Sequence, residues 1–153
     1  MIFYLGADHR GFKLKEALKK FLKDQAYEII DFGNDHYDEE DDYPDFAEKV
    51  AKVVSRNPDS SYGLVICGSG VGVDIVANRF PNVRCVLGIT PDIAAASRTD
   101  DNTNVLALAA DFTEEAQAKR IISVWLQTSY DKQPRHQRRI EKISAIENRI
   151  KNS

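Results

Sequence analysis

The sequence lacks the features that identify disulfide-rich, membrane-spanning, secreted and nucleic-acid-binding proteins. It contains two cysteines, Cys67 and Cys85, too far apart for a metal-binding knuckle and too few for a disulfide scaffold. No apolar run approaches the roughly 18 residues of a membrane span, and the opening run ends at Asp8, too early for a secretory leader. The net charge is −3, so no long-range attraction to nucleic acid or an anionic membrane is expected. We therefore predict a cytoplasmic protein with free thiols and with no nucleic-acid or membrane partner.

The composition is that of an ordinary globular protein. Of 153 residues, 42% are hydrophobic and 29% charged, so the chain is neither disordered nor fibrous. No linker or internal repeat divides it. The length corresponds to one domain, which we expect to cover residues 1–153.

Short apolar runs alternate with amphipathic patterns along the chain, which is typical of βαβ units. We expect a three-layer α/β/α sandwich, Rossmann-like, with a five-stranded parallel sheet and an extra C-terminal helix. The expected strands are 2–6, 27–32, 62–67, 83–89 and 104–109, and the expected helices are 11–26, 44–54, 73–80, 91–98, 113–127 and 135–150. In such sheets ligands bind at the carboxyl ends of the strands.

Candidate functional residues lie at the carboxyl ends of two of the expected strands. Asp8 and His9 follow the first strand, and Cys67 precedes the turn GSGVG at 68–72. Glycines let backbone N–H groups approach an anion, and a following helix adds the positive end of its dipole. The alternative is a tight turn without function. Neither standard nucleotide loop is present, which leaves a dinucleotide site, with Asp92 on the ribose, as a weaker alternative.

Several side chains allow both a functional and a purely structural interpretation. Cys67, close to a helix start, suits a base, whereas Cys85 in an apolar strand suits the core. His36 lies in the acidic loop 34–43, which lacks the ligand spacing of a calcium site. We therefore expect this loop to be exposed to solvent. Tyr43 at its end could line the mouth of a pocket. Arg135 and Arg139 share a helix face and can clamp a phosphate, or can form a solvated face.

Four segments in this order, ADHRG, ICGSGVG, SRTDDNTNVLAL and RHQRRIEKISAIE, resemble the ribose-5-phosphate isomerase B family, which includes the galactose-6-phosphate isomerase subunits. The resemblance covers nearly the whole chain. It implies aldose–ketose isomerisation of a phosphorylated sugar through a cis-enediolate, without metal or cofactor, in a homodimer whose sites draw on both subunits. Ribose 5-phosphate is the expected substrate.

The resemblance also implies roles for individual residues. Cys67 would be the base that moves the proton between C2 and C1, with the Ser69 hydroxyl beside it. Asp8 would hold substrate hydroxyls. The anion hole would be backbone N–H groups of Gly68, Gly70, Val71 and Gly72, and the phosphate grip would be His9, Arg135 and Arg139, the arginines coming from the second subunit.

The chain departs from the family pattern at three positions. Where many members have a histidine that opens the furanose ring and then an asparagine, this chain has Asp100 and Asp101, and Asp111 replaces an arginine after the last strand. We hypothesise that Asp100 opens the ring, since a protonated carboxyl can shuttle a proton between the ring oxygen and O1, with Asp101 beside it. Alternatively the two aspartates cap a turn and the sugar opens in solution. Loss of the arginine removes one expected positive contact from the pocket.

These departures keep two other functions open. The substrate could be another sugar phosphate, such as allose or galactose 6-phosphate. The chain could also be a sugar-phosphate-binding module without turnover, although the presence of Cys67 argues against that.

Overall fold

A computed structural model describes all 153 residues. Its strands are β1 (Ile2–Ala7), β2 (Glu28–Asp31), β3 (Ser61–Cys67), β4 (Cys85–Leu87) and β5 (Val105–Ala109). Its helices are α1 (Phe12–Asp24), α2 (Tyr43–Arg56), α3 (Val71–Ala77), α4 (Pro91–Asp101), α5 (Glu115–Gln127) and α6 (Pro134–Lys151). None of these helices is both long and apolar enough to cross a membrane.

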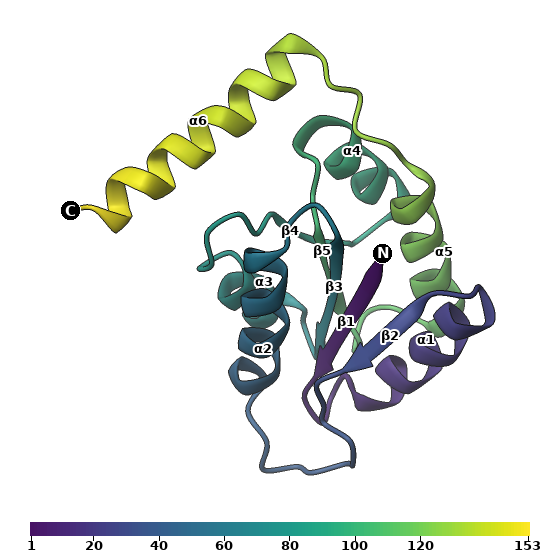
Figure 1. Ribbon diagram of the computed structural model, residues 1–153. Helices are drawn as coiled ribbons and strands as arrows, with labels where there is room; N and C mark the ends of the chain where they lie inside the picture. Colours follow the sequence, from purple (N-terminus) through teal and green to yellow (C-terminus); the bar gives the residue numbers. More distant parts are fainter.

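The strands form one parallel sheet in the order β2-β1-β3-β5-β4, with helices on both faces (Figure 1). One apolar cluster joins the sheet to α1, α4 and α5, and a second joins its other face to α2 and α3. The central strands are apolar throughout because both their faces are covered. The predicted three-layer fold with a C-terminal helix is confirmed.

The chain reverses its direction of winding at β1 and β3. From β1 it moves outward to β2, then returns to add β3 on the other side of β1. Helices on either side of such a switch point lie on opposite faces and leave a crevice at the carboxyl ends of the two strands. Asp8 follows one of these strands and Cys67 ends the other.

Two elements differ from the sequence prediction near the candidate residues. The fourth strand has only three residues, because β4 is an edge strand that pairs with β5 alone. Helix α4 continues three residues past its predicted end, so Asp100 and Asp101 form its last turn rather than a turn before β5. Asn102, in the left-handed conformation (φ 48°), ends the helix, and its side chain accepts a hydrogen bond from Arg98 (3.0 Å).

Helix α6 projects from the body of the domain (Figure 1). His136, near its start, is its one buried residue, and its isoleucines Ile143, Ile146 and Ile150 are exposed. An 18-residue helix with one buried residue gains little stability from packing on its own domain. Ile150, near its end, is 70% exposed.

A buried polar network ties α4 to α5 below the last turn of α4. The Thr103 hydroxyl accepts a hydrogen bond from the Trp125 indole N–H (2.9 Å) and lies 2.9 Å from the Ser97 hydroxyl. The Arg98 guanidinium lies over the Trp125 ring and donates to the Thr103 carbonyl oxygen. The network fixes where α4 ends, and with it the position of Asp100.

Thr103→Val is expected to lower the free energy of unfolding by about 1–3 kcal/mol, because it leaves the buried Trp125 N–H without an acceptor. Urea unfolding followed by Trp125 fluorescence measures this. The matched control is Thr99→Val on α4. The Thr99 hydroxyl makes no hydrogen bond, so this substitution should change the free energy of unfolding far less. Equal effects of the two variants would show that the network does not stabilise this region.

Candidate active site

A pocket of about 270 Å³ opens at the carboxyl ends of β1 and β3. It brings together residues that the sequence separates by more than sixty positions. Its lining consists of Asp8, Arg10, Tyr43, Cys67, Gly68, Ser69, Val71, Gly72 and Ile75. The expected base, hydroxyl and glycine turn therefore share one cavity with the expected hydroxyl-binding carboxylate.

The glycine turn brings the chain from β3 into α3 in a conformation that side chains disfavour. Gly70 has a φ of 72°, and a Cβ there would lie 2.5 Å from Leu87 and 3.0 Å from the Leu108 carbonyl carbon. The first N–H groups of the following helix have no intrahelical acceptor. The Val71 N–H donates to the Ser69 hydroxyl at 3.4 Å, a long hydrogen bond that an anion can replace.

Asp8 and Cys67 are both buried, at 5% and 4% exposure, yet both line the pocket. Burial raises the pKa of Asp8, against the hydrogen bond that its carboxylate accepts from the Gly11 N–H (3.0 Å) and the nearby His9. A carboxyl group of this kind can accept a hydrogen bond from a sugar hydroxyl or hold its proton. Tyr43 closes the opposite wall, since a Cβ on Gly72 would lie 2.5 Å from its ring.

His9 is held by an aspartate that the sequence reading missed. Asp41 accepts hydrogen bonds from the His9 backbone N–H (2.9 Å) and lies 2.7 Å from its ring Nδ1, while Asn34 donates to the other carboxylate oxygen (3.1 Å). The hydrogen bond to Asp41 raises the pKa of His9. For Asp41, burial raises the pKa but the hydrogen bonds from His9 and Asn34 outweigh it, so its pKa is lowered. A cationic His9 suits a phosphate.

Arg10 is the second residue that the sequence reading missed. Its guanidinium lies against Gly68, where an added Cβ would clash with it, and it forms an ion pair with Asp111. Asp111 is placed there because its backbone N–H donates to the Gly68 carbonyl oxygen (3.0 Å). Asp111 therefore pairs with Arg10 from the β1–α1 loop, and the expectation that its presence removes one positive contact from the pocket stays a prediction.

The remaining candidates lie elsewhere in the chain. Asp100 and Asp101 end α4 and precede β5 at its amino end, whereas Cys67 pairs with Ala109 at its carboxyl end. β5 spans about 13 Å from first to last Cα at about 3.3 Å per residue. Arg135 and Arg139 are on α6, whose His136 lies 3.7 Å from Asp100. One chain therefore holds two separate groups of candidate residues.

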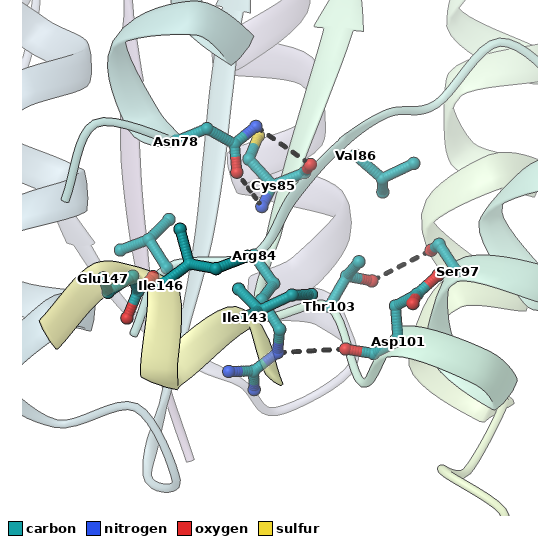
Figure 2. Close-up of a pocket in the computed structure, with 11 residues that line it drawn as sticks. Asn78, Arg84, Cys85, Val86, Ser97, Asp101, Thr103, Ile143, Ile146 and Glu147 are labelled. Atoms are coloured by element: carbon teal, nitrogen blue, oxygen red, sulfur yellow. Dashed lines mark hydrogen bonds between the residues drawn. The ribbon is translucent and has the colours of Figure 1, made fainter. Parts of the chain in front are cut away.

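A second cavity, about 410 Å³, is larger than the one that holds Cys67. It lies between β4, α4 and the inner side of α6, where Ile143, Ile146 and Glu147 face the body of the domain (Figure 2). Arg84 crosses its floor and donates to the Asp101 carbonyl oxygen (2.9 Å). Cys85 lines it, and burial raises the pKa of this thiol well above its ordinary value, which makes it a poor nucleophile. This cavity contains neither the glycine turn nor Cys67.

Comparison with known proteins identifies the class. Residues 3–143 match the ribose/galactose isomerase family. Ribose-5-phosphate isomerase B of Escherichia coli is 40% identical over 94% of this chain and 95% of its own, and a probable ribose-5-phosphate isomerase B of Mycoplasma genitalium is 38% identical over 94% of each. The crystal structure of the M. genitalium enzyme with bound ribulose 5-phosphate superposes with a TM-score of 0.93 at 37% identity, covering 96% of both chains. The Clostridium thermocellum enzyme gives 0.92 at 38% identity, covering 98% of this chain and 99% of its own.

The chain therefore belongs to the ribose/galactose isomerase family. It is an isomerase, as its motifs predict, and the carboxyl-end pocket contains residues of two of the four motifs, ADHRG and ICGSGVG.

Asp41→Asn is expected to lower the pKa of His9 toward the ordinary imidazole value of about 6.5, because the carboxylate stabilises the charged ring. In the wild-type protein the His9–Asp41 pair contributes its full stabilisation at pH values below the pKa that His9 has in the unfolded chain. This contribution is lost as the pH rises through the higher pKa that His9 has in the folded protein. It is also lost at acid pH, as Asp41 protonates below its ordinary value of about 3.9.

An NMR titration of the three imidazoles measures the effect. Asp35→Asn is the matched control, since Asp35 raises the pKa of the exposed His36 in the same way. That variant should shift His36 and leave His9 unchanged. A His9 pKa that does not fall in Asp41→Asn contradicts the assignment.

Proposed function

We propose that this enzyme interconverts ribose 5-phosphate and ribulose 5-phosphate, with Cys67 as the base. The observation that carries the proposal is the single pocket that contains Cys67, Asp8 and the glycine turn. Relatives named for this reaction, one of them with ribulose 5-phosphate bound, support the choice of substrate.

The Cys67 thiolate takes the proton from C2 of the open-chain aldose. The C–H electron pair forms the C1–C2 double bond of a cis-enediolate, and the proton returns to C1, while a hydroxyl proton passes from O2 to O1. Negative charge develops on oxygen, where N–H groups of residues 68–72 can stabilise it by several kcal/mol, as in comparable oxyanion holes. Asp8 accepts hydrogen bonds from the sugar hydroxyls, and Ser69 lies beside the reacting carbons. His9 and the free donors of Arg10 attract the phosphate.

We further propose that the working site lies between two copies of the chain. The group formed by Asp100, Asp101, Arg135 and Arg139 cannot reach the Cys67 pocket of its own chain, because β5 separates them. Helix α6 extends away from the domain with exposed isoleucines, as an arm that packs on a second subunit would. In a two-fold dimer the same contact occurs twice and completes two sites.

Cys67→Ala is expected to lower ketose formation from ribose 5-phosphate by about 10²–10⁴-fold, the usual contribution of a general base. The measurement is an NMR time course in D₂O with a chelator present, which follows both ketose and deuterium at C2. Cys85→Ala is the matched control and should retain activity. Binding of ribose 5-phosphate by the wild-type protein without deuterium incorporation would instead indicate a binding module, and activity on allose or galactose 6-phosphate alone would change the substrate.

Mixed dimers test whether the site is shared. Cys67→Ala chains and chains with Arg135→Ala and Arg139→Ala should each be nearly inactive as pure dimers. Co-refolded together they should recover about one quarter of wild-type activity, since half of the dimers are mixed and each mixed dimer has one intact site. Cys67→Ala mixed with Asp8→Ala is the control and should recover nothing, because both changes fall in the same half-site. No recovery in the first mixture would show that each site comes from one chain.

A further inference from the structure

Helix α1 contains a lysine, Lys15, whose side chain is completely buried. Its ammonium group donates to a carboxylate oxygen of Asp31 (2.6 Å), the last residue of β2, and to Glu16 (2.8 Å). The less buried Lys19 donates to the same two carboxylates, each at 2.8 Å. Two cations and two anions therefore form one cluster, which offsets the cost of taking the Lys15 charge out of water.

Stability alone does not require this cluster. Replacing a buried ion pair by apolar residues of similar volume is often neutral or stabilising. An ion pair of this kind does hold its partners in one place. Burial raises the pKa of Asp31, but the hydrogen bonds from Lys15, Lys19 and the Gly33 N–H outweigh it, so the pKa is lowered. Asp31 is therefore a fixed carboxylate at the point where β2 passes into the following loop.

Asp31 determines how that loop begins. Its second carboxylate oxygen accepts a hydrogen bond from the Gly33 backbone N–H (2.9 Å). Gly33 and Asn34 then continue the pairing with β1, because the Gly33 carbonyl oxygen accepts from the Ala7 N–H and the Asn34 N–H donates to the Ala7 carbonyl oxygen, both at 2.9 Å. Ala7 is the last residue of β1, so the start of the loop is fixed beside the carboxyl-end pocket.

Asn34 connects the loop to an imidazole at the pocket. Its side-chain amide donates to one oxygen of Asp41 (3.1 Å). The other oxygen of Asp41 accepts from the His9 backbone N–H (2.9 Å) and lies 2.7 Å from the His9 ring Nδ1. The Tyr37 ring, from the same loop, lies edge-on to the His9 ring with 6.2 Å between the ring centroids. The loop after β2 therefore holds both the backbone and the ring of His9.

We propose that Lys15 is a positioning residue for binding of the substrate phosphate, because it fixes the loop that holds the His9 imidazole. This rests on the proposed function, in which His9 attracts that phosphate. Lys15 does not line the pocket and acts only through Asp31, Asn34 and Asp41. A less well-placed His9 weakens binding of the phosphate in the ground state and the transition state alike, which raises KM and leaves kcat nearly unchanged.

Lys15→Met removes the charge and keeps the approximate length of the side chain. The Kd of inorganic phosphate and the KM for ribose 5-phosphate should each rise by about 3- to 10-fold, with kcat within about twofold of wild type, a size of effect usual among members of one hydrogen-bond network. The matched control is Lys20→Met on the same helix. Lys20 is exposed and pairs with Asp24 instead (2.8 Å), so this variant should change none of the three constants. Circular dichroism shows that both variants are folded.

The pKa of the His9 imidazole distinguishes positioning from a general effect of charge. Loss of a positive charge elsewhere in the protein raises the pKa of an imidazole, whereas a weaker hydrogen bond to Asp41 lowers it. An NMR titration of Lys15→Met should show a lower His9 pKa and an unchanged His36 pKa. Asn34→Ala leaves the ion cluster intact and should show the same fall and the same weaker phosphate binding, so the test does not depend on folding of Lys15→Met.

A double variant tests whether Lys15 acts through His9. His9→Ala should itself bind inorganic phosphate more weakly, and adding Lys15→Met to it should not change the Kd further. An unchanged Kd in Lys15→Met or in Asn34→Ala, a His9 pKa that does not fall, or an equal further loss in the His9→Ala protein would each overturn the role of Lys15 alone. If His9→Ala binds phosphate as tightly as the wild-type protein, the phosphate contact in the proposed function is wrong, and the role of Lys15 with it.

Discussion

The parallel register of β3 between β1 and β5 is the constraint on which the site depends. Ala7 pairs with Ile66 and Cys67 pairs with Ala109, so all three strands end together. The loops that follow are then held to one another, since Ala110 and Asp111 donate to the Cys67 and Gly68 carbonyl oxygens (2.9 and 3.0 Å). A strand covered on both faces cannot slip by one residue without burying the wrong side chains. Cys67 and the glycine turn are therefore held both by the register of the core strands and by these hydrogen bonds between loops.

The same strands separate the two groups of candidate residues within one chain. A strand separates whatever precedes it from whatever follows it, and Asp101 precedes β5 while Asp111 follows it. The residues at the end of α4 lie at the amino end of β5 for this topological reason. In the proposed dimer, the two-fold axis would make each copy give its α6 to the other.

The sequence predicted the architecture because strand and helix periods alternate cleanly, and it predicted the Cys67 pocket because strand ends meet in a parallel sheet. It could not predict partners that depend on side-chain direction. Asp41, which holds His9, belongs to an acidic loop that the sequence predicts to be exposed to solvent. Arg10 reaches across Gly68 to Asp111, about a hundred residues away in the chain. The end of α4 was missed because the hydrogen bond between Arg98 and Asn102, which closes the helix, is invisible to hydrophobic periodicity.

Arg10 and Asp111 join the β1–α1 loop to the segment after β5 through an ion pair beside the glycine turn. The guanidinium has five N–H donors, and the ion pair engages only one of its nitrogens. The net charge that Arg10 adds is largely cancelled by Asp111, so its effect on an anion is directional, through hydrogen bonds, more than long-range. The charge of a protonated His9 is likewise paired, with the Asp41 carboxylate that raises the pKa of the ring, so His9 also acts on an anion at short range.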